Sequence, residues 1–255
     1  MGPGYGIDGC VVLPPAADRR GWAVRGGPVR RQALRRRYYD LFSRLYDRFV
    51  TWHSGEPTGP MRRALAERAT QVSARRVLDL CCGTGAVTWA LAETAPADTV
   101  VVGLDFSWGM LSRGKAGVER AGCSGIRWVQ ADAAALPFKN GVFDVVTCAY
   151  ALYELKGQAR SVMLCEVARA LARGGRFLAM EHEVPTRRLL RALFFVRLWV
   201  IGAEGARAFL GGEVQEFGRV FPRVAREVLP PGKSKIVMGA KAATPPEADQ
   251  ATCAR

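Results

Sequence analysis

The sequence lacks any hydrophobic run long enough to cross a membrane, and its N-terminus lacks the apolar segment of a secretory signal. A membrane-spanning helix needs about 20 consecutive apolar residues, and a signal peptide needs an apolar core of about 7 to 15 residues. Hydrophobic residues nevertheless make up 49% of the chain, which is enough to build a core. We therefore expect a globular, cytoplasmic protein.

Regularly spaced cysteines are also absent. The chain has seven cysteines, an odd number, of which Cys81 and Cys82 are adjacent, and no two of them form a CxxC motif. A disulfide framework and a zinc site both depend on regular cysteine spacings. The sequence therefore predicts a reducing compartment and no metal site.

Acidic residues are scarce: 23 stand against 37 basic residues, which gives a net charge of +14. Residues 1–37 hold eight arginines and two aspartates and so contribute +6 of this charge, in a segment rich in glycine and proline. Such a segment cannot build a hydrophobic core. We expect residues 1–34 and 243–255 to be disordered tails, the first being either a solvated leader or a basic arm for RNA or anionic lipid.

Between the tails we expect one folded domain over residues 35–242, beginning with a helical lid over residues 35–70. Apolar and aromatic residues recur at helical spacing over 35–51. Glycines and prolines interrupt this pattern, and a second helix follows over 61–70. Tyr46 and His53 lie in this lid and are candidates for contact with a substrate.

Strand-like and helix-like segments alternate after the lid. The β-branched runs lack alternating polarity, which is typical of strands buried on both faces. Their alternation with helices predicts a parallel sheet covered by helices on both sides. The predicted strands are 76–80, 99–104, 126–130, 143–149 and 176–181, and the predicted helices are 86–95, 108–121 and 158–172, the last ended by Gly174-Gly175.

The C-terminal part follows a different rule. Residues 224–229 and 235–240 are both strand-like, and only a short segment around Pro230-Pro231-Gly232 separates them. A parallel crossover needs a dozen or more residues, so these two strands must pair antiparallel. The fold class is therefore α/β, with a Rossmann-like, mostly parallel sheet, helices on both faces and an antiparallel C-terminal hairpin.

The segment VLDLCCGTGAVTWAL, residues 77–91, predicts a ligand site at the end of the first strand of the sheet. Gly83 and Gly85 allow main-chain N–H groups to approach a ligand, and the following helix N-terminus favours a carboxylate or phosphate. A dinucleotide site would have a third glycine where Thr88 stands, and a P-loop would have a lysine. Asp79 before the turn suits the ammonium group of an amino acid better than a diphosphate, as in S-adenosylmethionine (SAM).

Acidic residues also follow the next two strands. Asp105 comes twenty residues after Gly85, where a carboxylate can accept hydrogen bonds from both hydroxyls of a ribose. Phe106 can lie against an adenine ring. Asp132 can accept a hydrogen bond from the adenine amino group, and the Ala133 N–H can bond a ring nitrogen. A glycine turn and two acids in this order predict SAM as the cofactor.

Five segments resemble motifs of the class I SAM-dependent methyltransferases: VLDLCCGTG, GLDFSWGML, ADAAALPF, FDVVTCAYALYEL and EVARALARGGRFLAMEH. Within this class the chain most resembles the ubiquinone/menaquinone-biosynthesis C-methyltransferases. The segment FSRLYDRF is similar to the N-terminal helix of that group. The resemblance covers about residues 38–240, and it implies a seven-stranded sheet whose last hairpin is reversed.

The resemblance also implies roles for particular residues. Thr84 and its glycine neighbours would hold the methionine part of SAM, and Ala149 would lie near it. Asp105 would bind the ribose. Asp132 and Ala133 would hold the adenine. Cys81 stands where the family usually has a glycine, and we expect it to have a structural role.

Candidates for the acceptor side follow the fourth and fifth strands. They are Tyr150, Tyr153 and Glu154 after the fourth strand, and Glu181, His182 and Glu183 after the fifth. We take His182 and Tyr150 as catalytic candidates, and Tyr153 and Glu181 as substrate contacts. Two flanking carboxylates would raise the pKa of His182 if they are close and ionised. The alternative is a loop histidine with a structural hydrogen bond.

The segment LLRALFFVRLWVIGA, residues 189–203, is apolar almost all round, with Arg191 and Arg197 as the exceptions. It is too short to span a bilayer. It predicts either a buried or pocket-lining helix, or a helix that contacts a membrane surface while its arginines reach the head groups. Both suit a lipid-like acceptor.

The predicted function is methyl transfer from SAM to a small-molecule or lipid-like acceptor, such as a quinone precursor or another aromatic ring. The basic N-terminal arm leaves an RNA methyltransferase as the alternative, although the segment CAYALYE does not match the Asn/Asp-Pro-Pro-Tyr motif of exocyclic-amine enzymes. A cytosine C5 enzyme would need a nucleophilic cysteine beside a proline, and Cys148 has none. A module that binds SAM without turnover is a third reading.

Overall fold

The computed structural model describes residues 6–7, 10–11, 59–120, 125–155, 158–200 and 206–243. Strands β1 (Gly6–Ile7) and β2 (Cys10–Val11) pair antiparallel inside the segment that we expect to be a tail. The predicted helix over 35–51 lies outside the described residues, as do Tyr46 and His53.

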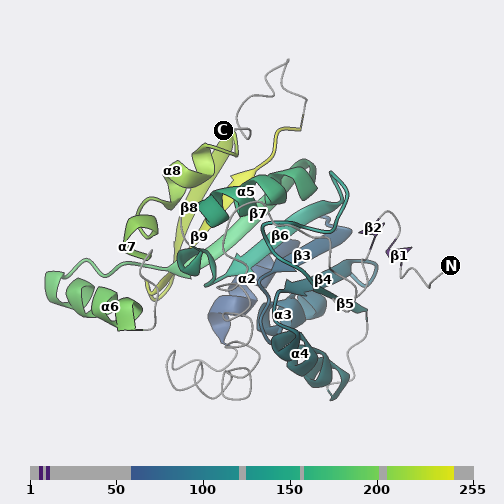
Figure 1. The fold of residues 1–255 in the computed structure, drawn as a ribbon, viewed down its shortest axis with the longest axis horizontal. Coiled ribbons are helices and arrows are strands. Elements are labelled where there is room, and N and C mark those ends of the chain that lie inside the picture. Colours follow the sequence, from purple (N-terminus) through teal and green to yellow (C-terminus); the bar gives the residue numbers. More distant parts are fainter. Residues whose placement is uncertain are drawn as a thin grey trace, which may run out of the picture.

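Seven strands form one sheet in the order β5-β4-β3-β6-β7-β9-β8 (Figure 1). The pairs among β3 to β7 are parallel, whereas β9 pairs antiparallel with both β7 and β8. This sheet confirms the predicted fold class, including the C-terminal hairpin. The strands are β3 (Arg76–Leu80), β4 (Val100–Asp105), β5 (Ile126–Gln130), β6 (Phe143–Ala149), β7 (Leu171–His182), β8 (Arg223–Leu229) and β9 (Ser234–Ala240).

Helices cover both faces of the sheet because successive side chains of the buried strands point in opposite directions. Leu78 and Leu80 pack toward α5, whereas Val77 packs with Leu65 and Leu91 of α2 and α3. The helices are α2 (Pro60–Thr70), α3 (Ala86–Thr94), α4 (Trp108–Arg120), α5 (Gln158–Ala170), α6 (Arg188–Val200), α7 (Ala206–Phe209) and α8 (Glu213–Gly218), with a 3₁₀ turn, η2, at Leu152–Glu154.

The strand order reverses between β3 and β6. The chain runs outward from β3 to β4 and β5, and then returns to pair β6 with the other side of β3. In an open parallel sheet, the crevice at the carboxyl ends of the strands on either side of such a reversal is the usual ligand site. The glycine turn after β3 and the acid at the end of β4 therefore lie at the expected place.

The boundary between α5 and β7 is predicted wrongly by several residues. Helix α5 ends at Ala170, and β7 begins at Leu171, although the sequence predicts a helix to residue 172 and a strand from 176. The early start is possible because Leu171 pairs with Phe143 and the register then shifts, so that the next pair is Val145 and Arg176. An irregularity within β7 thus stands where Gly174-Gly175 predict a turn at the end of the helix.

The prediction of a buried helix over 189–203 is wrong for one side of α6. Leu198 is buried, but Leu189 and Trp199 are 72% and 68% exposed. Phe195 and Leu198 line a cavity together with the exposed Trp199, so the pocket-lining part of the prediction is confirmed. In the described part of the chain, no helix is both long enough and apolar enough to cross a membrane.

A buried ion pair fixes α8 against α5. Arg160 is 5% exposed, and its guanidinium donates to both carboxylate oxygens of Glu216 at 2.6 Å. A further donor atom bonds the Leu155 carbonyl oxygen, and the guanidinium lies 4.3 Å from the centre of the Phe209 ring. A charge in this position depends on its partner because water does not reach it.

We expect Glu216→Ala to lower the free energy of unfolding by about 3 kcal/mol, because it leaves the Arg160 charge buried without its carboxylate. Glu67→Ala, which breaks the exposed pair of Arg63 and Glu67, should cost less than about 1 kcal/mol. Urea denaturation measures both. Equal effects of the two substitutions would contradict the account.

Candidate active site

The turn after β3 adopts a left-handed backbone at three residues: Cys81, Gly83 and Gly85 have φ angles of 55°, 55° and 81°. A Cβ on Gly85 would lie 2.5 Å from Cη2 of Trp128, so only glycine fits there. A Cβ on Gly83 would enter open space, with no atom within 4 Å. The turn is therefore packed on one side and open on the side where a ligand can approach.

Asp105 joins the end of β4 to this turn. One carboxylate oxygen accepts the Gly83 N–H, and the other accepts the Ser107 N–H, both at 2.9 Å. The side chain is 5% exposed. Burial raises the pKa of Asp105 to about 6, against the lowering effect of the hydrogen bonds from Ser107 and Gly83.

Asp79 is held between two strands and a helix. Its carboxylate accepts hydrogen bonds from Thr88 of α3 at 2.6 Å and from Thr147 of β6 at 2.9 Å. Burial raises the pKa of Asp79 to about 6, and the nearby charge of Asp105 acts in the same direction. The contact of Asp79 with an ammonium group stays a prediction, since the described bonds fix the aspartate to its own fold.

The predicted adenine residues lie on the β4 and β5 side of the crevice. Asp132 turns the chain after β5, where its side chain accepts the Ala134 N–H at 2.9 Å. The carbonyl oxygen of Phe106 accepts a bond from Gln130 at 3.0 Å, which ties the two strand ends together. Ala133 is buried beside them.

The start of α3 is the part of the crevice where we expect the amino-acid end of SAM. Helix α3 begins at Ala86 with no side-chain cap and no acidic residue in its first turn. No side chain of α3 therefore neutralises the positive end of the helix dipole, and this end favours the binding of a carboxylate. Ala149 ends the neighbouring strand β6. Elsewhere in the described residues, no cluster of His, Cys, Asp and Glu could hold a metal ion.

Aromatic rings form a wall at the carboxyl ends of β6 and β7. The His182 ring centre lies 4.7 Å from that of Tyr150, 5.5 Å from that of Tyr153 and 6.0 Å from that of Phe194 on α6. The Tyr150 hydroxyl is 2.7 Å from the Ser234 hydroxyl. Tyr150 also has a positive φ of 54°, an uncommon conformation for a bulky residue. We define Tyr150, Tyr153, His182 and Phe194 as the aromatic wall.

The two acids beside His182, Glu181 and Glu183, bond other residues. Glu181 is fully buried and accepts the Leu152 N–H at 2.9 Å, and its other oxygen has no hydrogen-bond partner among the described residues. Burial raises the pKa of Glu181 well above its usual value. Glu183 pairs with Arg226 at 2.6 Å and with Lys235 at 3.6 Å. Lys235 is itself buried and also pairs with the buried Glu213.

Three thiols lie near the crevice. Contact with Cys81 and burial raise the pKa of the Cys148 thiol well above its usual value. Burial and the charges of Asp105 and Asp79 do the same for Cys82. A cysteine nucleophile needs a lowered pKa, so neither Cys82 nor Cys148 suits nucleophilic chemistry.

Sequence reasoning missed the partners that position these groups. Trp128 of β5 fills a slot beside Gly85, Gly103 and Gly114, each of which has no room for a Cβ without approaching the indole ring. Thr88 and Thr147 are buried and hold Asp79. The sequence held a signal for this packing only at Gly103, because a glycine inside a strand often marks a place where another group approaches the backbone closely.

The reversal in strand order, the open glycine turn after β3 and the acids after β4 and β5 together define a class I SAM-dependent methyltransferase, and SAM is its methyl donor. The model of the ubiE/COQ5 methyltransferase family matches residues 45–204. The chain belongs to this family, as its motifs predict.

Two relatives are demethylmenaquinone methyltransferases. The Lactococcus lactis enzyme is 34% identical over 156 residues, which are 61% of this chain and 61% of that enzyme. The Thermus thermophilus enzyme is 32% identical over 210 residues, which are 79% of this chain and 86% of that enzyme. The alignment with the Lactococcus enzyme thus spans less than two thirds of its length.

A solved structure supports the fold. A candidate SAM-dependent methyltransferase from Methanococcus maripaludis superposes with a TM-score of 0.61 and 16% identity, over 88% of this chain and 99% of that one. At this identity the likeness concerns the fold alone. The alternative of an RNA methyltransferase receives no support from these relatives.

We expect Gly85→Ala to destabilise the protein by about 3 kcal/mol, because the new Cβ strains the left-handed backbone and collides with Trp128. Gly83→Ala should cost about 1 to 2 kcal/mol, from the backbone strain alone, yet weaken SAM binding because its Cβ enters the open side of the turn. Denaturation and titration calorimetry measure the two effects. The account fails if the two variants lose equal stability.

SAM affinity should rise as the pH increases through about 6, the pKa of Asp79 and Asp105. Below that pH the carboxyl groups are protonated, so Asp105 accepts the ribose hydroxyls poorly and Asp79 offers no negative charge to the ammonium group. Above that pH both groups are ionised. Their contribution to folding has the opposite sign: because the folded pKa is above the unfolded value, it is present below about pH 4 and is lost between about pH 4 and 6.

Calorimetric titration with SAM between about pH 5 and 8 tests this. Asp105→Asn should weaken binding by about 10- to 100-fold at neutral pH and flatten the profile. Because the two acids interact, the apparent pKa belongs to the pair. A pH-independent affinity in the unsubstituted protein would contradict the assignment.

Proposed function

We propose that the chain methylates a carbon of an aromatic ring in a lipid-soluble quinone precursor of the demethylmenaquinone type. The observation that carries this proposal is the aromatic wall, which ends the strands β6 and β7 beside the SAM crevice. A flat ring can stack or pack edge-on against such a surface. The names of the relatives support the same acceptor.

SAM would be held by the residues of the crevice. These are Asp79, Gly83, Thr84, Gly85, Asp105, Phe106, Asp132, Ala133 and Ala149. When bound, SAM supplies an activated methyl group on a sulfonium centre. The chain then has to align the acceptor carbon with that methyl group and to exclude water, and alignment of this kind can account for about 7 to 11 kcal/mol in the best intramolecular cases.

His182 would accept a proton from a ring hydroxyl of the acceptor. The loss of this proton raises the electron density at the neighbouring ring carbon, which would form the new bond to the methyl carbon while the bond between that methyl carbon and the donor sulfur breaks. The hydrogen on the ring carbon would then leave as a proton to solvent, which restores the aromatic ring, and the protonated His182 would return its proton to the ring oxygen. Tyr150, held by Ser234, would position the acceptor, and Tyr153 would pack against it. Glu181 lies behind the wall and would act through Leu152 on η2.

The apolar tail of the acceptor has a place beside the wall. A cavity of about 840 Å³ lies between α6 and α7. Its apolar lining includes Val184, Phe195, Leu198 and Leu210, and three arginines, Arg188, Arg191 and Arg207, also line it. Phe195 lies 5.3 Å from Phe194 of the wall, measured between ring centres. Ligand pockets commonly have a volume of about 300 to 1,000 Å³ and mostly apolar walls.

We expect His182→Gln to lower kcat by about 10²- to 10⁴-fold while leaving the Kd for SAM unchanged, because a proton acceptor is lost but the cofactor crevice is intact. Tyr150→Phe keeps the ring and removes only the hydroxyl, so it should lower kcat less. Transfer of label from SAM to a prenylated naphthoquinol, with product identification by mass spectrometry, measures both.

Label that enters RNA, or an acceptor oxygen rather than a ring carbon, would overturn the proposal. An unchanged kcat in His182→Gln would remove the histidine from the mechanism without touching the assignment of the acceptor. The dependence of kcat on pH tests whether His182 acts as a base or only positions the acceptor. The acidic limb of this profile should vanish in His182→Gln and persist in Tyr150→Phe.

A further inference from the structure

Helix α6 carries the largest group of exposed apolar side chains in the described part of the chain. Five large residues are exposed by about half or more: Leu189 (72%), Trp199 (68%), Leu193 (57%), Val196 (57%) and Leu190 (49%). Leu189, Leu193 and Val196 are spaced by four and three residues, which places them on one side of the helix. Other exposed apolar residues, such as Trp108 and Val162, lie singly on different helices.

Positive charge gathers at the N-terminal end of the same helix. Arg187, Arg188 and Arg191 lie at the N-terminal end of α6, and the helix contains no acidic residue. Arg207 follows on α7, with its guanidinium 5.7 Å from the centre of the Phe195 ring. A second copy of this chain also carries a net charge of +14. If two copies met at this surface, their arginines would repel one another. The charge instead fits a negatively charged surface.

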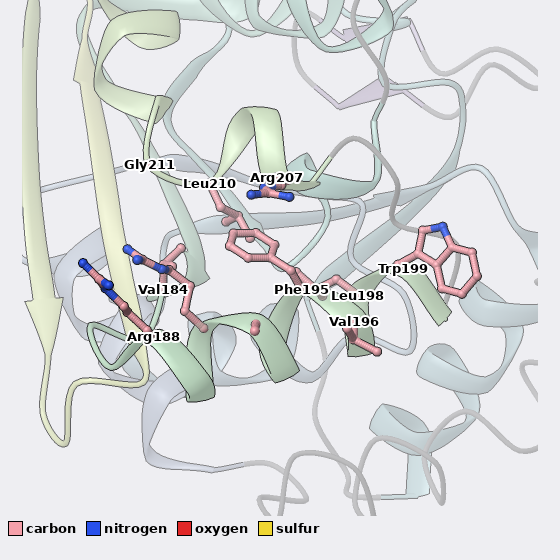
Figure 2. A pocket seen from close by; sticks show the side chains of 11 residues that line it. Val184, Arg188, Phe195, Val196, Leu198, Trp199, Arg207, Leu210 and Gly211 are labelled. Carbon is pink, nitrogen blue, oxygen red and sulfur yellow. The ribbon is translucent and has the colours of Figure 1, made fainter.

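The same helix reaches the proposed acceptor site. Phe194 contacts His182 in the aromatic wall, whereas Phe195 lines the adjoining cavity. Val196 and Trp199 are both exposed and part of the cavity lining, so the cavity opens toward the exposed side of the helix. Figure 2 shows the Trp199 side chain at the right-hand end of the lining, apart from the other labelled side chains, while Phe195 lies beneath Arg207.

The position of α6 leaves room for such contact. Figure 1 shows the helix at the margin of the molecule, away from the sheet. Its 13 residues give a length of about 20 Å, which is too short to cross the roughly 30 Å hydrocarbon core of a bilayer. An apolar side flanked by arginines is typical of helices that lie in the plane of the membrane interface.

We propose that α6 docks the protein on an anionic lipid bilayer. Leu189, Leu193 and Val196 enter the interface, and Arg188 at the N-terminal end of the helix contacts lipid phosphates. The inference rests on the proposed function for its purpose, because a lipid-soluble quinone precursor would pass from the bilayer into the cavity beside α6. It deepens that function by naming the surface from which the acceptor comes.

Vesicle cosedimentation of the full chain tests the proposal. Vesicles of phosphatidylglycerol and phosphatidylcholine should bind the protein, vesicles of phosphatidylcholine alone should bind it weakly, and added salt should weaken the binding. Leu193→Glu should reduce the binding by about tenfold or more, because it places a charge in the apolar side of the helix. Val162→Glu changes an exposed valine on another helix, α5, where Val162 is 41% exposed, and it should leave the binding unchanged.

Two further measurements separate the outcomes. With a short-chain, water-soluble naphthoquinol, Leu193→Glu should retain the methylation rate of the unsubstituted protein, and with a long-chain acceptor in vesicles it should lose rate in proportion to binding. Binding that survives Leu193→Glu overturns the docking proposal, as does a dimer in gel filtration that this substitution dissociates. Vesicle binding without methylation of either acceptor would contradict the proposed function and leave the docking surface intact.

Discussion

The contact between Asp105 and the Gly83 N–H is the interaction on which the site depends. It joins the end of β4 to the turn after β3 at 2.9 Å and so fixes the shape of the crevice. The same carboxylate also accepts the Ser107 N–H, which sets the start of α4. The acid that is predicted to hold the ligand's ribose is therefore also the acid that builds the space for it.

This double role has an electrostatic cost. Asp79 and Asp105 are both buried, and their pKa values are both raised to about 6, chiefly by burial. Hydroxyl and main-chain donors offset part of the cost, from Thr88 and Thr147 for one acid and from the turn for the other. A ligand with hydroxyl and ammonium groups offers further donors. We therefore expect the crevice to prefer SAM over an anionic dinucleotide.

The sequence predicts most of the sheet: 76–80, 126–130 and 143–149 match the structure residue for residue. Two of these strands, 76–80 and 143–149, are mostly buried apolar runs, whereas only Val129 of 126–130 is buried. It does not predict the end of α5, which depends on pairing between Leu171 and Phe143, nor the slot of Trp128. These features come from neighbours distant in sequence. The apolar side of α6 is exposed for the same reason: periodicity cannot say whether another element covers a helix.

A crystal structure with S-adenosylhomocysteine, the demethylated donor, would test the central claim most directly. The account predicts that its ribose hydroxyls lie within hydrogen-bond distance of Asp105, with the adenine beside Asp132 and the amino-acid end at the start of α3. A crevice that stays empty under these conditions, but accepts a nicotinamide dinucleotide, would contradict it.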